Sequence, residues 1–367
     1  MNIDDFKSLL RKIMPLIYVI MGGMVIYYNL LDRSELSTSI GILFISYGVY
    51  RAAIHWRKHN DANQWVWLFF LATPLTSCQK QQGPKLDTPT TGQITVAIDE
   101  SYQPVFDAAI TVFDSIYTRA AIFPAYAPMQ TIVEDLLTDS VQVVVLPREL
   151  NESELAYFKK RQFTPRITLI AKDGLALISH PSNQDSILTV EEVRQILTGE
   201  KKSWKDVQKN TDKGAIQIVF DNNQSGTVAY AIDSICRGQA LSQQNAFAVK
   251  NSAEVVNYVA SNPNAIGIIG VNWISDMDDP QAQDFLKKIK VIGISRAEGK
   301  EAFQPFQAYI ATGQYPFIRN IYFINAQARS GLGMGFASFL ANERGQRIVL
   351  KSGLLPATQP IRLVRMN

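Results

Sequence analysis

Residues 219–227 read Val-Phe-Asp-Asn-Asn-Gln-Ser-Gly-Thr, and this stretch says most about how the chain folds and what it binds. An apolar run that stops at Asp221 is typical of a buried strand, and the polar residues after it lead to Ser225-Gly226-Thr227 at the start of a helix. Free backbone N–H groups at a helix start can bind an oxyanion together with the two hydroxyls, and Gly226 would let that ligand approach the backbone closely. A plain helix cap by Ser225 would use the same residues, so the motif leaves both interpretations open.

Outward from this stretch, short apolar runs alternate with amphipathic segments. The expected strands are Ile94–Ile98, Ala120–Ala127, Val141–Leu146, Ile167–Ala171, Leu175–Ser179, Ile216–Phe220, Ala265–Val271 and Lys288–Gly293. The expected helices are Gln103–Tyr117, Gln130–Leu137, Glu152–Lys160, Thr189–Thr198 with a capping-box start, Gly226–Cys236, Ser252–Ser261, and one long helix over Ser330–Gly353. Strands that alternate with helices of about ten residues indicate βαβ units, mostly parallel sheets and the α/β class.

The alternating pattern occurs twice, which indicates two α/β lobes with helices on their sheets. We expect the first lobe to comprise residues 93–172 and 292–367, and the second lobe to comprise residues 173–291. The chain would cross between them near 171–175 and again near 290–305. In such a molecule a ligand binds between the lobes, where strands end and helices begin.

The first 56 residues have a different character from the rest. Residues 13–31 carry no charge and come close to the roughly 20 residues that a membrane-spanning helix needs. A second, shorter apolar run covers about residues 37–50 and ends at Arg51, whose long side chain could reach the membrane interface. Because basic residues flank the pair and only Arg33 lies between the two runs, we expect a two-helix membrane hairpin over residues 1–56 with both ends in the cytoplasm. The alternative is a pair of buried helices in a soluble domain.

Residues 57–78 resemble a bacterial lipoprotein signal. A basic flank at Arg57-Lys58 precedes an apolar run, and Leu75-Thr76-Ser77-Cys78 is similar to the lipobox that ends in a lipidated cysteine. Residues 79–92 are polar and contain Pro and Gly, as is typical of a flexible tether. We therefore expect a lipid on Cys78; the alternative is a chance cysteine at the end of a membrane segment.

Composition excludes several classes of function. The 367 residues carry a formal net charge of +3, and this near balance argues against a dedicated nucleic-acid binder. Two cysteines, Cys78 and Cys236, are too few for a disulfide scaffold or a Cys-rich zinc module, and three histidines leave little for metal binding. We expect Cys236 to be a buried thiol, and we expect no metal and no cofactor. The sequence shows no nucleophile elbow and no catalytic cluster, so we expect a binding protein and not an enzyme.

Four segments together indicate a known family. They are the turn Ser225-Gly226-Thr227, the strand Ala265–Gly270, the segment Val145–Leu150, and a C-terminal part in which Tyr315-Pro316 and Ile321-Tyr322 precede Phe336–Pro356. These segments resemble the PstS-like phosphate-binding proteins of ABC transporters. The resemblance covers about residues 93–358. It implies a type II periplasmic-binding-protein fold of the Venus-flytrap kind, in which two lobes close on an oxyanion.

The resemblance also implies, by position, which residues hold the oxyanion. The contacts from the first lobe would be Ser101, Tyr102 and the turn at Met129-Gln130. The contacts from the second lobe would be Ser225, Gly226 and Thr227. Arg148 is the nearby cation that could join them, unless it forms a surface ion pair.

Some positions differ from the family pattern and add acidic side chains. Asp221 stands where family members often carry an arginine, Asp99-Glu100 replaces a Gly-Ser pair, and Pro147 replaces a Ser or Asp. A carboxylate can accept a hydrogen bond from a protonated phosphate, but it repels a fully ionised anion. We include Asp221 among the expected ligand contacts on this basis.

Together these features predict an envelope-anchored solute-binding protein that captures phosphate or a related oxyanion for an ABC permease. The lobes would lie in the periplasm or otherwise outside the inner membrane of a bacterium. The alternative is the same fold with an altered pocket, acting as an accessory, scaffold or sensor of another envelope complex. The expected partners are thus a small oxyanion, the membrane and a permease or other envelope complex, but not nucleic acid.

Overall fold

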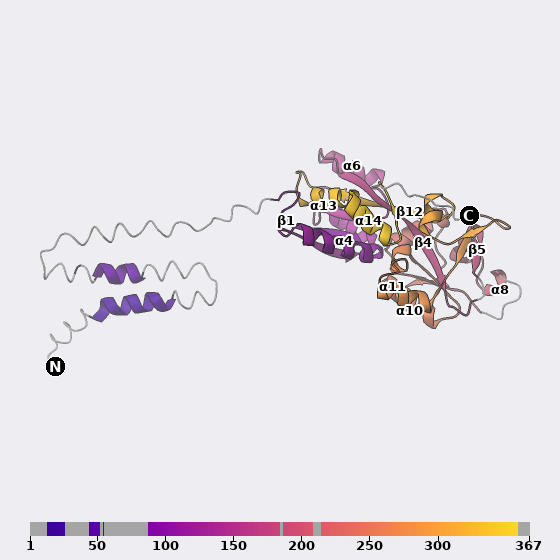
Figure 1. Ribbon diagram of the computed structural model, residues 1–367, viewed down its shortest axis with the longest axis horizontal. Helices are drawn as coiled ribbons and strands as arrows, with labels where there is room; N and C mark the ends of the chain where they lie inside the picture. The colour runs from indigo at the N-terminus through magenta and orange to yellow at the C-terminus, as the bar shows by residue number, and fades with distance from the viewer. Residues whose placement is uncertain are drawn as a thin grey trace. The chain divides into compact units, whose positions relative to one another are not determined.

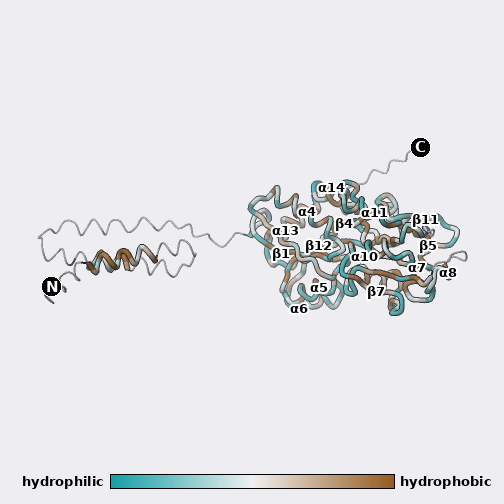
Figure 2. The backbone as a smooth tube through the Cα atoms, turned by 90° about the horizontal axis from the view of Figure 1, so that it is seen from below, coloured by the Kyte–Doolittle hydropathy of each residue, from teal (hydrophilic) through white to brown (hydrophobic). Residues whose placement is uncertain are grey.

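The structure is a computed structural model, and it describes residues 13–25, 44–51, 54, 87–183, 186–207 and 214–358. The chain forms two units, Met1–Gly83 and Pro84–Asn367. In the first unit, residues 13–25 and 44–51 are helical, and the described helical part is mostly hydrophobic (Figure 2). Among the residues described, no helix has the length and apolar character required to cross a membrane. The rest of the predicted hairpin, the signal segment with Cys78 and most of the predicted tether lie outside the described residues.

The second unit has two lobes that share one curled, mixed β-sheet (Figure 1). Its strands follow the order β2 (Ala120–Ala127), β1 (Gly92–Asp99), β3 (Val143–Leu146), β12 (Ile318–Asn325), β4 (Arg166–Ser179), β8 (Ala265–Gly270), β6 (Gln217–Phe220) and β7 (Ala246–Ala248). Two short strands, β9 (Lys290–Val291) and β13 (Leu355–Pro356), also pair with β4. A separate small sheet contains β11 (Ala302–Phe303), β10 (Gly293–Ser295) and β5 (Ile187–Thr189).

Strand β4 belongs to both lobes. Its residues up to Gly174 pair with β12, and from Leu175 onward they pair with β8. The sequence predicts two separate strands here, Ile167–Ala171 and Leu175–Ser179, on either side of the expected crossing between the lobes. That prediction is wrong: Asp173 lies directly opposite Arg319 of β12, and this buried pair lets the strand continue through the polar positions.

In the first lobe, β1 pairs in parallel with β2 and β3, and apolar clusters form on both faces of these strands. The helices of this lobe are α4 (Gln103–Ile116), α5 (Met129–Leu137), α6 (Glu152–Lys160), α13 (Leu332–Ala341) and α14 (Glu343–Lys351). Phe113 of α4 packs edge-on against Phe336 and Phe339 of α13, with ring centroids 5.2 and 5.3 Å apart. Strand β2 forms the edge of the sheet and contains Pro124.

The C-terminal helix is broken. The sequence predicts one helix over residues 330–353, but the structure has α13 and α14 with Asn342 between them. The Asn342 side chain accepts hydrogen bonds from the backbone N–H groups of Arg344 and Gly345, which makes it the N-cap of α14. An asparagine inside an apolar helical pattern thus marks a new helix start.

In the second lobe, helices surround β6, β7 and β8. They are α7 (Val190–Thr198), α8 (Trp204–Val207), α9 (Gly226–Tyr230), the π-helical turn η2 (Ala231–Ile235), α10 (Ser252–Ser261), the short turn η3 (Val271–Trp273) and α11 (Pro280–Lys288); α12 (Gln307–Ala311) follows later in the chain. The predicted capping box at Thr189 is confirmed, because Thr189 and Glu192 each accept the other's backbone N–H. Cys236 is buried, as expected.

Candidate functional site

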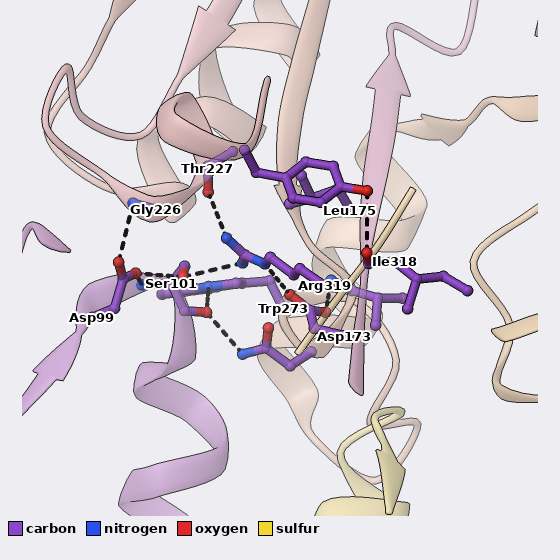
Figure 3. Close-up of polar contacts among 12 residues, drawn as sticks. Asp99, Ser101, Asp173, Leu175, Gly226, Thr227, Trp273, Ile318 and Arg319 are labelled. Carbon is purple, nitrogen blue, oxygen red and sulfur yellow. Dashed lines mark hydrogen bonds and ion pairs between the residues drawn. The ribbon is translucent and has the colours of Figure 1, made fainter. Parts of the chain in front are cut away.

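The candidate site lies where β1 and β6 end, and each strand brings a buried aspartate to it. Strand β1 ends at Asp99, which the turn η1 (Glu100–Tyr102) follows, and Asp221 comes directly after β6. Because β1 and β6 belong to different lobes, side chains of both lobes meet at this point (Figure 3).

The turn Ser225-Gly226-Thr227 opens helix α9 from the second lobe. The Ser225 hydroxyl accepts the N–H of Val228 at 3.2 Å, which confirms the helix-cap interpretation. The same hydroxyl donates to the Asp221 carboxylate at 2.6 Å, and the Thr227 hydroxyl donates to that carboxylate at 3.2 Å. Asp221 therefore orients both hydroxyls that the sequence assigns to a ligand.

The Asp99 carboxylate connects the two lobes. Its Oδ2 atom accepts the backbone N–H of Gly226 at 3.1 Å, from the second lobe (Figure 3). Its Oδ1 atom accepts the N–H of Ser101 at 3.0 Å and also the Ser101 hydroxyl, from its own lobe. Hydrogen bonds to an ionised carboxylate are about twice as strong as neutral ones. An oxyanion of the protein itself thus lies against Gly226, where the resemblance places a ligand oxyanion.

The first lobe packs tightly onto Gly226. A Cβ atom at this glycine would lie 2.3 Å from Cγ of Pro147 and 2.8 Å from Oδ2 of Asp99, so a side chain cannot be added without movement. The backbone N–H of Gln130 also donates to the carbonyl of Gln224 at 3.2 Å. The close approach predicted for Gly226 is therefore made by Pro147.

The buried cation of the site is Arg319 of β12, which the sequence analysis does not identify. Its Nε atom lies 2.8 Å from Asp173, and its terminal nitrogens donate to the hydroxyls of Ser101 at 3.2 Å and Thr227 at 3.4 Å (Figure 3). Its guanidinium carbon lies 4.9 Å from the centroid of the Tyr102 ring, which is within cation–π distance. One buried guanidinium therefore reaches a hydroxyl on each lobe.

Arg148 does not join this group. Its guanidinium donates to both carboxylate oxygens of Glu154, at 2.8 and 2.7 Å, and it also reaches the carbonyl of Glu149. The ion-pair alternative for Arg148 is therefore the arrangement in the structure. The other predicted contacts, Ser101, Tyr102, Gln130, Asp221, Ser225, Gly226 and Thr227, all contribute atoms to the contacts described above.

Acidic groups outnumber the cation, and burial changes their protonation. Burial, followed by the charges of Asp221 and Asp99, raises the pKa of Glu100 to about 8. Burial also raises the pKa of Asp221 to about 6, although the hydrogen bond from Ser225 opposes this rise. Near neutral pH, Glu100 therefore retains its proton, whereas Asp221 is mostly an acceptor.

Three buried polar atoms of this region have no hydrogen-bond partner among the described residues: Glu100 Oε1, the Tyr102 hydroxyl and Asn272 Oδ1. The Asn272 side chain is held in place because its Nδ2 atom donates to the Ser101 carbonyl at 3.0 Å. Buried polar atoms normally have partners, so these three are available to a polar ligand. Over the described part of the chain, no group of three or more His, Cys, Asp or Glu side chains has the arrangement of a metal site.

Comparisons with known proteins agree with this fold. A family model described as a PBP superfamily domain matches residues 83–344. The phosphate-binding protein PstS of Pseudomonas aeruginosa is 26% identical over 227 residues, which cover 58% of this chain and 66% of that protein. The phosphate-binding protein PstS of Borreliella burgdorferi is 21% identical over 298 residues, which cover 79% of this chain and 97% of that protein. A phosphate-bound protein of Clostridium perfringens, provisionally described as a phosphate ABC transporter substrate-binding protein, has a TM-score of 0.60 at 22% identity and covers 72% of this chain and 100% of its own.

Proposed function

Since the chain belongs to the PBP superfamily, we propose that it is a solute-binding protein whose two lobes capture phosphate or a related oxyanion for an ABC-type uptake system. The similarity to phosphate-binding PstS proteins supports phosphate as the first candidate ligand. Capture and delivery need no covalent step, so the protein acts as a carrier and not as an enzyme.

The observation that carries the proposal is the buried guanidinium of Arg319, which lies within reach of the hydroxyls of Ser101 and Thr227 on opposite lobes. A guanidinium beside hydroxyl groups is a common way to hold an oxyanion. Here the two hydroxyls accept from Arg319 and donate to Asp99 and Asp221, so a bound oxyanion would replace the carboxylates as their acceptor. Arg319 would supply the positive charge that the loop before Ser225 lacks, because that loop carries Asp221.

The test is calorimetric titration of the full-length chain, purified in detergent, with phosphate and with sulfate. Phosphate carries protons at neutral pH that a carboxylate such as Asp221 can accept, whereas sulfate carries none. We therefore expect phosphate to bind and sulfate to bind at least about tenfold more weakly, because a buried carboxylate left facing an unprotonated anion is unfavourable. No heat and no thermal shift at millimolar phosphate would contradict the phosphate assignment and favour a scaffold or sensor.

A single hydroxyl provides a sharper measure of the same site. Thr227→Val should weaken phosphate binding by roughly 1–3 kcal/mol, because a buried donor is lost while the volume is kept. Thr111→Val, on an exposed position of α4, is the matched control and should leave the affinity unchanged. Equal affinities for the two variants would mean that the Thr227 hydroxyl serves only its bonds to Asp221 and Arg319 within the protein.

The anchoring belongs to the same proposal: a membrane hairpin over residues 1–56 and a lipid on Cys78, with the lobes outside the inner membrane. Mass spectrometry of the isolated chain should detect an added lipid that Cys78→Ser abolishes. Co-purification with permease subunits would support the uptake role, whereas co-purification with a different envelope complex would favour the accessory role.

A further inference from the structure

We propose that the Asp99 carboxylate holds the two lobes together through its bond to the Gly226 N–H, and that it competes with the ligand oxyanion for that donor. We call this contact the latch. The inference rests on the proposed function in one respect, namely that the ligand uses the donors around Gly226. The latch itself does not depend on the identity of the ligand.

One carboxylate takes donors from both lobes. Asp99 is fully buried, and its two oxygens divide between the lobes: Oδ1 accepts two hydrogen bonds from Ser101, and Oδ2 accepts the N–H of Gly226, which lies 127 positions further along the chain. Of these three bonds, the one from Gly226 crosses between the lobes, as does the backbone bond between Gln130 and Gln224 nearby. The two bonds from Ser101 fix the Asp99 side chain in the position from which it reaches the second lobe.

The same contact excludes a second anion from Gly226. A backbone N–H has one hydrogen, so an oxyanion that takes the Gly226 donor must replace Asp99 Oδ2. Pro147 also fills the space beside the Gly226 Cα, because its Cγ would lie 2.3 Å from a Cβ at that position. A ligand oxyanion and Asp99 thus compete for the same N–H donor.

A cation and several polar groups that suit an oxyanion ligand lie beside Asp99. Arg319 donates to Ser101 and Thr227, and its ion-pair partner is Asp173. The Tyr102 hydroxyl and Asn272 Oδ1 are both more than nine-tenths buried, and neither has a hydrogen-bond partner among the described residues. A ligand that displaces Asp99 would therefore find a cation and polar groups already in position.

The latch predicts whether a given substitution raises or lowers the apparent affinity for the ligand. When a ligand must first open a contact, its apparent affinity falls in proportion to the fraction of molecules in which that contact is open. Weakening the latch raises the apparent affinity, whereas removing a residue that binds the ligand lowers it. Asp99 should behave in the first way and Thr227 in the second.

The decisive variant is Asp99→Asn in the full-length chain. An asparagine retains the shape and can still accept from Ser101 through Oδ1, but its NH₂ group then faces the Gly226 N–H and cannot accept from it. We expect phosphate to bind about tenfold more tightly, the order of effect of one charge-assisted bond. Glu149→Gln is the control, because it removes an exposed negative charge two positions after Pro147 without touching the latch.

Hydrogen–deuterium exchange gives a readout that does not need phosphate. Without added phosphate, the segment 222–230 should exchange faster in Asp99→Asn than in the unmodified chain, and Glu149→Gln should leave it unchanged. Asp99→Ser also removes the bond to Gly226 and should give the same faster exchange of segment 222–230. This second variant keeps the test possible if Asp99→Asn does not fold.

The outcomes separate the two proposals. Tighter binding together with faster exchange supports the latch. Unchanged or weaker binding in Asp99→Asn, or an equal gain in Glu149→Gln, overturns it. If no form of the protein binds phosphate, the proposed function fails, and unchanged exchange at 222–230 would still reject the latch.

Discussion

Arg319 and Asp173 face each other in adjacent strands, and both side chains are almost completely buried. Removing one partner of a buried ion pair leaves the other charge without compensation, which typically costs about 3–5 kcal/mol. We therefore expect Arg319→Gln to lower the free energy of unfolding by about that amount. Urea denaturation of the full-length chain, followed by circular dichroism, measures the change.

Two controls sharpen this prediction. Arg347→Gln breaks an exposed pair with Glu343 and should cost less than about 1 kcal/mol. The double variant Asp173→Asn with Arg319→Gln should be more stable than the sum of the single losses predicts, because neither side chain then carries an unpaired charge. A loss in Arg319→Gln no larger than in Arg347→Gln would show that the buried pair contributes little.

At the residue scale, two local helix caps were predictable from the sequence, whereas the distant contacts of Arg319 were not. Ser225 as a helix cap and the Thr189 capping box depend on neighbours within four positions, and the sequence predicts both. The role of Arg319 depends on Asp173, 146 positions away, and on Ser101, 218 positions away. The available signal was a single arginine in the otherwise largely apolar run of residues 318–325. This signal indicates a buried cation, but it does not show which residues the arginine contacts.

At the scale of elements, Asn342 determines where one helix stops and the next begins. Its side chain satisfies the first free N–H groups of α14, so Asn342→Ala should lower the free energy of unfolding by about 1 kcal/mol. Arg344→Ala changes an exposed side chain two residues after Asn342 and serves as the control. Equal urea midpoints for the two variants would argue against a capping role.

The order and type of most elements followed from the apolar pattern, because each lobe buries its strands between amphipathic helices. The break in the C-terminal helix was missed although it depends on a local cap by Asn342. The error at β4 occurs where a polar residue has a tertiary partner: residues 172–174 were expected to separate two strands, yet Asp173 continues β4 through its pairing with Arg319. Strand β12 was not predicted, because Arg319 and Asn320 interrupt its apolar residues and the segment does not resemble a fully buried strand.

For the whole molecule, the raised pKa values of Glu100 and Asp221 make stability depend on pH. The folded protein retains protons on these carboxyl groups that the unfolded chain releases, because their pKa values are about 8 and about 6 when folded. The free energy of unfolding should therefore be highest in mildly acidic solution and fall as the pH rises toward about 8. Urea midpoints between mildly acidic and mildly alkaline pH measure this slope.

Glu100→Gln tests which group is responsible. Its side chain is neutral at every pH, so the decline above neutral pH should largely disappear, while the decline below it that Asp221 causes should remain. Asp107→Asn, an exposed change on α4, should retain the full slope. A slope unchanged in Glu100→Gln would show that other groups control the pH response.

The edge strand β2 has a consequence for how copies of this chain behave when crowded. A free sheet edge offers a row of backbone donors and acceptors that can template the addition of another chain, which is a route to aggregation. Pro124 lies in the middle of β2, and proline has no N–H to offer to an incoming strand. A second molecule that added a strand at this edge would find no N–H at Pro124, which disfavours continued pairing beyond β2.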